Sequence, residues 1–417
     1  MATDLGADGW LLISAALVLF MTPGLAFFYG GMDRSRNVLN MLMMNFWCLL
    51  IIPIVWVVIG YSVAYGDTAG SLFGGFDAAF LGNLNLTSQS GADTLMLVAF
   101  LGMFAVITPA LISGAVADRM KFAAWAIFVP VWTLLVYVPV TYWVFSPNGW
   151  LLNRGSLDFA GGTAIHVNAG IAALAVVLVL GKRAGWPEKV SPPHSMPLVM
   201  LGTGILWFGW FGFNAGSALA ANGTAVQAFM NTFLAAAAAG LAWAVVERIR
   251  DGHFTNLGAA SGIVAGLVAI TPGAGFVAGM APLWIGAIAG VVCCFAVGLK
   301  NKAGYDDALD VVGVHFVGGL VGSLAIGFFA EPEFFGSDFM AGVFHGGGWQ
   351  LFGEQALANG VTIVYSFIVT TIIVLVLKAT IGIRVSEEEE ENGLDLAEHA
   401  ETAYHTGSST MSRLTRS

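Results

Sequence analysis

Charged side chains are scarce in this sequence. Lysine, arginine, aspartate and glutamate together make up 10% of the 417 residues, whereas soluble domains carry about 25%. Hydrophobic residues make up 57%. So little charge cannot cover a surface exposed to water, and the composition therefore excludes an ordinary soluble protein.

Cysteine and the usual marks of catalysis are also nearly missing. The three cysteines, Cys48, Cys293 and Cys294, lie within apolar stretches, where we expect small packing residues and no disulfide. No spacing indicates a nucleophile with its base, a metal cluster or a phosphate-binding loop. We therefore expect no enzyme activity, no metal, no cofactor and no nucleic-acid partner.

The chain instead contains a series of long apolar stretches. A helix rises about 1.5 Å per residue, so about 20 residues cross a hydrocarbon core of roughly 30 Å. The stretches are continuously apolar, which excludes a barrel of alternating strands. We predict an all-α integral membrane protein with eleven transmembrane helices, at about residues 10–31, 41–65, 95–117, 122–145, 160–181, 197–219, 225–246, 257–273, 276–299, 311–330 and 357–377.

Glycine is abundant within these stretches. The chain has 54 glycines, about twice the average usage of roughly 7%. Examples are Gly209 and Gly212 in the sixth predicted helix, and Gly318 and Gly319 in the tenth. Because small residues let helix backbones approach each other in lipid, the pattern predicts a tightly packed bundle.

Lysine and arginine lie almost entirely on one side of the predicted membrane. Alternate connections, beginning with the first, and the C-terminal tail contain nearly all of them, and the other connections contain only Arg154. Basic connections remain in the cytoplasm, which predicts an external N-terminus and a cytoplasmic C-terminus. Asp4 and Asp8 stand where a cleavable signal would carry basic residues, so we expect the first helix to be retained.

Two histidines, His166 and His315, are the only ones of seven within predicted helices. Each stands early in a glycine-rich stretch, Gly161–Gly170 in the fifth helix and Asp310–Gly319 in the tenth. Since these helices run in opposite directions, the positions are related by inversion, as in transporters with two inverted halves. We predict an inverted five-helix repeat, helices 1–5 and 6–10, followed by a final long helix.

An ionisable residue within a membrane is expensive and indicates a functional site. The alternative is that each histidine only bonds a neighbouring carbonyl. Burial disfavours the charged form of imidazole, so we expect both rings to be neutral. A neutral ring offers one donor and one acceptor. Two facing rings can therefore bond each other, and such a pair suits a small neutral molecule or a proton relay better than a resident cation.

Other unusual residues gather near the outer ends of the helices. Asp158 stands eight residues before His166, where an aspartate is a good N-cap and could also stabilise a passing cation. Aromatic rings near an interface usually anchor the protein in the membrane, but rings around a mouth can also hold a small cation. The rings concerned are those of Phe100, Phe104, Trp143, Phe145, Trp210 and Phe213.

Four stretches of the chain are long and specific enough to compare with known proteins. They are Ile107–Arg119, Leu157–Gly170, Gly209–Ser217 and Asp306–His315, and the tail adds Arg384–Asp395 with Glu398, His399, Ala403 and Tyr404. Together they resemble the ammonium transporters of the Amt branch of the Amt/Mep/Rh superfamily, over residues 10 to about 405. The resemblance implies a homotrimer in the cytoplasmic membrane with one pore per subunit.

The resemblance also implies roles for individual residues. His166 and His315 match the paired pore histidines, Phe104 and Phe213 the stacked rings that gate the pore, and Trp210 a pore-lining aromatic residue. The implied outer ammonium recruitment site comprises Phe104, Ser217, Phe145, Asp158 and Phe100.

One position departs from the family pattern. Phe145 stands where the family usually has a tryptophan, and phenylalanine is the weaker partner for a cation. Either recruitment is weaker in this chain, or Trp143 or Trp150 takes over the role.

The chain divides into a transmembrane transporter domain, residues 1–384, and a cytoplasmic tail, residues 385–417. From Arg384 onward there are eight acidic and three basic residues. Glu387–Glu391 is typical of a solvated surface, whereas Gly393, Leu394 and Asp395 are not. The resemblance implies that the tail is regulatory and that a PII-type signal protein binds the cytoplasmic face.

These features predict ammonium uptake across the cytoplasmic membrane. Ammonium would lose its proton at the outer site, and ammonia would pass along the two histidines, with or without coupled proton transfer. One alternative is a Rh-like facilitator of neutral gases, against which the Asp158 stretch and the tail argue. Another is an ammonium sensor coupled to a PII-type protein, against which the short tail argues.

Overall fold

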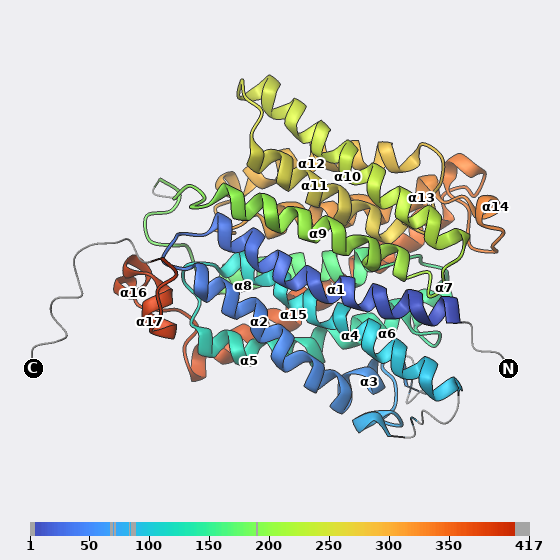
Figure 1. Cartoon of the computed structure of the whole chain (residues 1–417), viewed down its shortest axis with the longest axis horizontal. Coiled ribbons are helices and arrows are strands. Elements are labelled where there is room, and N and C mark those ends of the chain that lie inside the picture. The colour runs from blue at the N-terminus through green and yellow to red at the C-terminus, as the bar shows by residue number, and fades with distance from the viewer. Residues whose placement is uncertain are drawn as a thin grey trace, which may run out of the picture.

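The computed structural model describes residues 5–66, 70, 72–82, 84, 89–188 and 191–404. In these ranges eleven helical segments are long and apolar enough to cross a membrane, and no strand occurs beyond a single bridge between Met120 and Arg384. The prediction of an all-α membrane protein with eleven spanning helices is confirmed. In Figure 1 the helices lie side by side, with the N-terminus at one end of the bundle and the last short helices at the other. We name these ends the N-terminal face and the tail face.

The first five spans are built from the elements up to residue 180. They are α1 (Leu5–Met32), α2 (Val38–Val55), η1 (Trp56–Gly60), α3 (Tyr61–Tyr65), η2 (Ala79–Leu81), α4 (Gln89–Val116), α5 (Phe122–Trp132), η3 (Thr133–Tyr137), α6 (Val138–Phe145), α7 (Trp150–Arg154), η4 (Gly162–Val167) and α8 (Asn168–Leu180). The segments η1, η3 and η4 are π-helical turns that continue the α-helices beside them.

The remaining six spans and the tail follow. Their elements are α9 (Met196–Gly216), α10 (Gly223–Arg250), α11 (Asn256–Ile270), η5 (Thr271–Gly273), α12 (Ala281–Ala303), η6 (Val312–Phe316), α13 (Val317–Phe329), α14 (Pro332–Phe335), η7 (Val343–His345), α15 (Gln350–Thr380), α16 (Glu387–Asn392) and α17 (Leu394–His399). Of these, η6 is a fourth π-helical turn.

The last span begins well before its predicted limit, at Gln350 where 357 was predicted. The helix of the fourth span ends at Phe145 as predicted, and Trp150–Arg154 form the separate short helix α7. The added turns of the last span carry polar residues, such as Glu354 and Gln355 in α15. Apolar runs mark only the part of a helix that lies in hydrocarbon, so they underestimate helices that extend into the polar interface.

The first span, α1, and the sixth, α9, pack with their backbones in contact. A Cβ at Gly202 would lie 2.3 Å from the amide nitrogen of Phe28, and one at Gly212 would lie 2.9 Å from the carbonyl oxygen of Ser14. Since the contact moves toward the start of α1 as α9 advances, the two helices are antiparallel. These helices are the first of each predicted five-helix half, and glycine is what lets them touch.

The last spanning helix, α15, is attached by a buried polar stripe. The Asn359 amide nitrogen donates a hydrogen bond to the Ser323 hydroxyl at 2.7 Å, and the Gln355 amide donates to the Ser323 carbonyl at 3.1 Å. Two turns further on, the Ser366 hydroxyl donates to the carbonyl of Asn168 at 3.1 Å. Side-chain hydrogen bonds of this kind hold helices together in lipid, where the hydrophobic effect does not.

The tail folds back onto the tail face. The Leu394 amide donates to the side-chain oxygen of Asn37 at 2.8 Å, and the Asn40 amide donates to the Asp395 carboxylate at 2.8 Å. Leu394 and Asp395 are both buried, so this part of the tail is not a solvated charge run. Residues 405–417, which the predicted tail includes, lie outside the described residues.

Replacing Gly202 by alanine should destabilise the bundle, because the new methyl group would overlap the backbone of α1. Overpacking typically costs about 1–3 kcal/mol, and the thermal unfolding midpoint in detergent should fall. Gly204→Ala on the same helix is the matched control, since nothing lies within 4 Å of its Cβ position, and alanine is the better helix former. Equal midpoints for the two variants would contradict the backbone contact.

Candidate functional site

His166 and His315 meet in the middle of the bundle. Their Nδ1 atoms lie 3.3 Å apart, and the rings stack at a centroid distance of 5.3 Å and an interplanar angle of 18°. Each side chain is 2% exposed. The rings therefore face each other as the sequence predicts for a neutral pair that shares one hydrogen bond.

The two histidines occupy equivalent places in a repeated stretch. Each lies in a π-helical turn, η4 or η6, and each is preceded at a distance of eight residues by an aspartate, Asp158 or Asp307. Each is followed four residues later by a glycine, Gly170 or Gly319, against which the other turn packs. Since η4 starts at the N-terminal face and η6 at the tail face, the stretches are related by inversion.

The repeated aspartates hold the starts of the π turns. Asp158 accepts hydrogen bonds at 2.6–3.0 Å from four successive backbone N–H groups, at residues 161–164. Asp307 accepts two, from Val311 at 3.1 Å and Val312 at 2.7 Å. The cap predicted at Asp158 is present, and its equivalent Asp307 was missed, although the shared eight-residue spacing could have revealed it.

Burial raises the pKa of both aspartates. The pKa of Asp158 reaches about 6, although its four N–H donors lower it. The pKa of Asp307 also reaches about 6, where burial outweighs the lowering effect of Lys300. The Asp158 carboxyl group accepts its hydrogen bonds from the backbone at the start of η4. Asp158 is not among the residues that line the outer cavity.

The lumen beside the histidines is narrow and apolar. A cavity of about 10 Å³ is lined by the two histidines with Met21, Leu25, Ile107, Leu111, Leu206, Trp210, Phe213 and Val264. This is close to the space that one water molecule needs. The Trp210 ring stacks on His166 at 5.4 Å and is held by a hydrogen bond from its N–H to the Thr271 hydroxyl at 2.8 Å.

Two stacked rings close the lumen toward the N-terminal face. Phe104 and Phe213 lie 4.2 Å apart between centroids with an interplanar angle of 16°. Phe100 packs edge-on against Phe104 at 4.9 Å. The structure therefore brings together the three phenylalanines of the predicted gate and vestibule.

Beyond these rings lies an outer cavity of about 330 Å³. Phe100, Phe104, Phe145 and Ser217 line it, together with Tyr61, Tyr65, Leu97, Leu101, Tyr137, Pro147, Phe159, Ala160 and Leu219. The Ser217 hydroxyl donates its proton to the Phe213 carbonyl at 2.8 Å, so its oxygen lone pairs remain available to a hydrogen-bond donor.

Neither Trp143 nor Trp150 lines this cavity. The Trp143 indole N–H donates to the Leu72 carbonyl at 2.8 Å, and its ring packs on Tyr365 at 4.8 Å. Trp150 packs against Trp143 at 6.4 Å. Of the three candidates for the missing tryptophan of the family pattern, only Phe145 faces the cavity.

Tyr29 joins the histidine pair, and sequence reasoning missed it. Its hydroxyl donates to the Leu111 carbonyl at 3.2 Å and lies 3.5 Å from Nε2 of His315. If His315 carries its proton on Nε2, that proton points to the Tyr29 oxygen, and His315 Nδ1 accepts the bond from Nδ1–H of His166. This arrangement leaves His166 Nε2 as an acceptor, and that atom is buried without a partner among the described residues.

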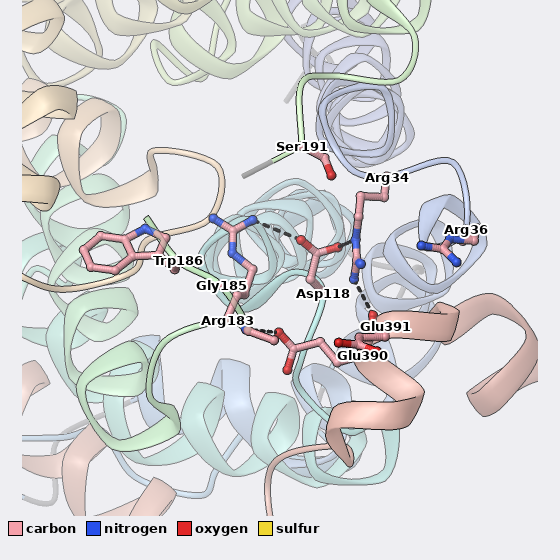
Figure 2. A pocket seen from close by; sticks show the side chains of 10 residues that line it. Arg34, Arg36, Asp118, Arg183, Gly185, Trp186, Ser191, Glu390 and Glu391 are labelled. Carbon is pink, nitrogen blue, oxygen red and sulfur yellow. Dashed lines mark hydrogen bonds and ion pairs between the residues drawn. The ribbon is translucent and has the colours of Figure 1, made fainter. Parts of the chain in front are cut away.

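A polar cavity of about 380 Å³ lies at the tail face (Figure 2). Arg34 and Arg183 each donate to the Asp118 carboxylate, at 2.9 and 3.0 Å. Burial raises the pKa of Asp118, but hydrogen bonding with Asp33 and the charges of the two arginines more than reverse this and hold it below its usual range. A smaller cavity of about 170 Å³ shares these three residues and reaches Asp310, at the start of the turn that carries His315.

Tail residues form one side of the larger cavity. Glu390 and Glu391 line it, and Arg34 donates to the backbone carbonyl of Glu390 at 2.8 Å (Figure 2). The Glu390 carboxylate accepts from the Ala184 amide and from Arg384, both at 2.7 Å. The tail is thus bonded to the rim of this cavity at the tail face.

Comparisons with known proteins agree with this geometry. The Ammonium Transporter Family matches residues 9–404. An ammonium transporter of Mycobacterium tuberculosis is 50% identical over 431 residues, covering 96% of this chain and 90% of that one. The solved structure of Candida albicans Mep2 superimposes with a TM-score of 0.86 at 32% identity, over 93% of this chain and 87% of that one. A solved structure described as a sensor Amt protein superimposes with a TM-score of 0.87 at 30% identity, over 94% of this chain and 98% of that one. The paired histidines in a narrow lumen therefore belong to a member of the ammonium transporter family.

Proposed function

We propose that the chain takes up ammonium across the cytoplasmic membrane, with its N-terminal face outside. The asymmetry of lysine and arginine supports this orientation. The chain acts as a transporter and not as an enzyme. As the family resemblance implies, three copies assemble into a homotrimer with one pore per subunit.

The observation that carries the proposed mechanism is the unpartnered Nε2 of His166 beside an apolar lumen of about 10 Å³. A bare cation gains too little there to offset its lost hydration. Ammonia is small and neutral, and it can donate an N–H to that nitrogen. The lumen therefore favours ammonia over ammonium and over potassium.

Ammonium is therefore deprotonated in the outer cavity, before it reaches the lumen. Ammonium entering it meets the oxygen of Ser217 and the ring faces of Phe104 and Phe145, which replace part of its hydration. The N–H bond breaks there with transfer of the proton to solvent water in the cavity, and ammonia passes between Phe104 and Phe213 when these rings move apart. Asp158 acts from behind the cavity wall by fixing η4, and its charge favours a cation at this mouth.

His166→Ala and His315→Ala test this mechanism. Each substitution removes a buried hydrogen-bonding partner, and the loss of such a partner costs about 1–3 kcal/mol. We therefore expect the uptake of labelled methylammonium into proteoliposomes, measured in competition with ammonium, to fall about tenfold or to lose its selectivity over potassium. His345→Ala, an exposed histidine near Glu331 at the N-terminal face, is the matched control. Retained uptake and selectivity in both pore variants would contradict the role proposed for the pair.

Whether the proton follows ammonia through the histidine pair can be measured separately. The pair is continuous through Nδ1 atoms 3.3 Å apart, which favours a proton relay and hence net charge transfer. We expect currents on a solid-supported membrane when ammonium is added. Intact flux without current would instead support neutral transport, as in the Rh-like alternative.

The docked tail would regulate transport, and a PII-type signal protein would act at the same face. The similarity to a sensor Amt protein also keeps a sensing role open as a second candidate, although the 50% identity to an ammonium transporter favours transport. The supporting observation is that Glu390 is 2% exposed and bonds both Ala184 and Arg384 beside the inner mouth.

Glu390→Ala should release the tail from the rim and lower uptake by about three- to tenfold, because each charge-assisted bond contributes roughly 1.5–3 kcal/mol to docking. Truncation after Arg384 should act in the same direction while assembly persists. The neighbouring Glu391 is exposed, and Glu391→Ala should transport normally. If the Glu390 variant and the truncated chain both transport at the normal rate, the tail does not control the pore.

A further inference from the structure

Three tyrosines line the outer cavity and have no role in the function proposed above. Tyr61, Tyr65 and Tyr137, here called the tyrosine cluster, share this 330 Å³ space with Phe104, Phe145 and Ser217. They come from two spans distant in sequence, the second (Val38–Tyr65) and the fourth (Phe122–Arg154). The cavity therefore has more aromatic surface than the sequence predicted.

The cluster is held rigidly by a tryptophan behind it. The Trp56 ring lies 5.8 Å from Tyr61, 6.3 Å from Tyr65 and 6.4 Å from Tyr137 between centroids. Its indole N–H donates to the Val98 carbonyl at 3.0 Å. Gly102 makes room for it, since a Cβ there would lie 3.0 Å from the ring. The rings are thus preorganised, which reduces the entropy lost on binding.

The backbone at the cluster is unusual in the same way as at the histidines. Tyr61 directly follows the π turn η1, and Tyr137 is the last residue of the π turn η3. In the described ranges the only other π turns are those that carry His166 and His315. Such turns are rare in helices and occur frequently at functional sites. The tyrosine cluster shares this backbone feature with the two histidines, and packing alone does not require it.

The groups with which the cluster lines the cavity suit a small cation. Tyr61 and Tyr65 stack at 5.6 Å with an interplanar angle of 27°. Both phenol groups line the cavity, and a phenol oxygen can accept a hydrogen bond from an ammonium ion. A carboxylate lies near, because a Cβ at Gly66, next to Tyr65, would be 2.7 Å from the side-chain oxygen of Asp77.

We propose that the tyrosine cluster is a second cation-binding subsite, which captures ammonium or a methylated ammonium ion before it reaches Phe104 and Ser217. This inference rests on the proposed function and identifies how this chain offsets Phe145, whose ring attracts a cation less than the tryptophan usual at that position. Neither Trp143 nor Trp150 reaches the cavity, whereas Tyr61 and Tyr65 line it and bring aromatic rings and phenol oxygens to it.

The test compares Tyr61→Leu, Tyr65→Leu and Tyr65→Trp with wild type, by measuring the KM and maximal rate of methylammonium uptake in proteoliposomes. Each leucine variant should raise KM about two- to fivefold, which corresponds to one exposed cation–ring contact, with the maximal rate nearly unchanged. Tyr65→Trp should lower KM, because tryptophan binds cations best. Tyr365→Leu, which removes a tyrosine outside the cavity, should leave both values unchanged.

The outcomes separate this inference from the function on which it rests. If wild type shows no ammonium-competed uptake, the proposed function itself is wrong. If wild type transports and the leucine variants keep the wild-type KM, or lose only maximal rate, the cluster is a packing element and the subsite is overturned. Should a leucine variant fail to fold, an unchanged KM in Tyr65→Trp overturns it as well.

Discussion

The contact between the two π turns is the constraint on which the rest of the structure depends. A Cβ at Gly170 would lie 2.4 Å from the amide nitrogen of Phe316, and one at Gly319 would lie 3.0 Å from the Cβ of His166. Any side chain at these two positions would force η4 and η6 apart. With glycine there, the backbones touch, and the two imidazoles are held close enough to share a hydrogen bond.

The same constraint explains why each turn needs a buried carboxylate. A helix start buried in the protein leaves backbone N–H groups without helical partners, and these groups need another acceptor. Asp158 supplies acceptors for four such groups and Asp307 for two. The two carboxyl groups therefore lie at the starts of η4 and η6 and not in the small cavity between these turns, which the ring pair and apolar side chains line.

The two mouths of the pathway differ because the repeat is broken outside its core. At the N-terminal face, aromatic rings and one hydroxyl line an open cavity. At the tail face, arginines and carboxylates pair closely, and Arg119, fully buried, donates to the carbonyls of Ala115, Ala117, Gly181 and Asp306. One end of the bundle therefore has an aromatic cavity, whereas polar contacts at the other end bind the helix ends and the tail together.

Sequence alone was sufficient for the class, the number of spans and the histidine pair. Long apolar runs, glycine within helices and an ionisable residue in lipid each have one dominant physical explanation, and these explanations agreed. The start of α15 was predicted too late, because its first turns are helical but carry polar residues, which an apolar run does not include. The inverted relation of His166 and His315 was also readable, since spacing to Asp and Gly repeats in the chain.

What only the tertiary structure decided is which side chains meet. No local sequence pattern predicts that Tyr61 and Tyr137, about 75 residues apart, line the same cavity. None predicts that the Trp143 indole bonds Leu72 and does not line that cavity. Nor does any pattern place Tyr29 beside His315. Periodicity and composition report the environment of a single segment, whereas these contacts depend on how several helices cross, and the crossing is set by the glycine contacts between them.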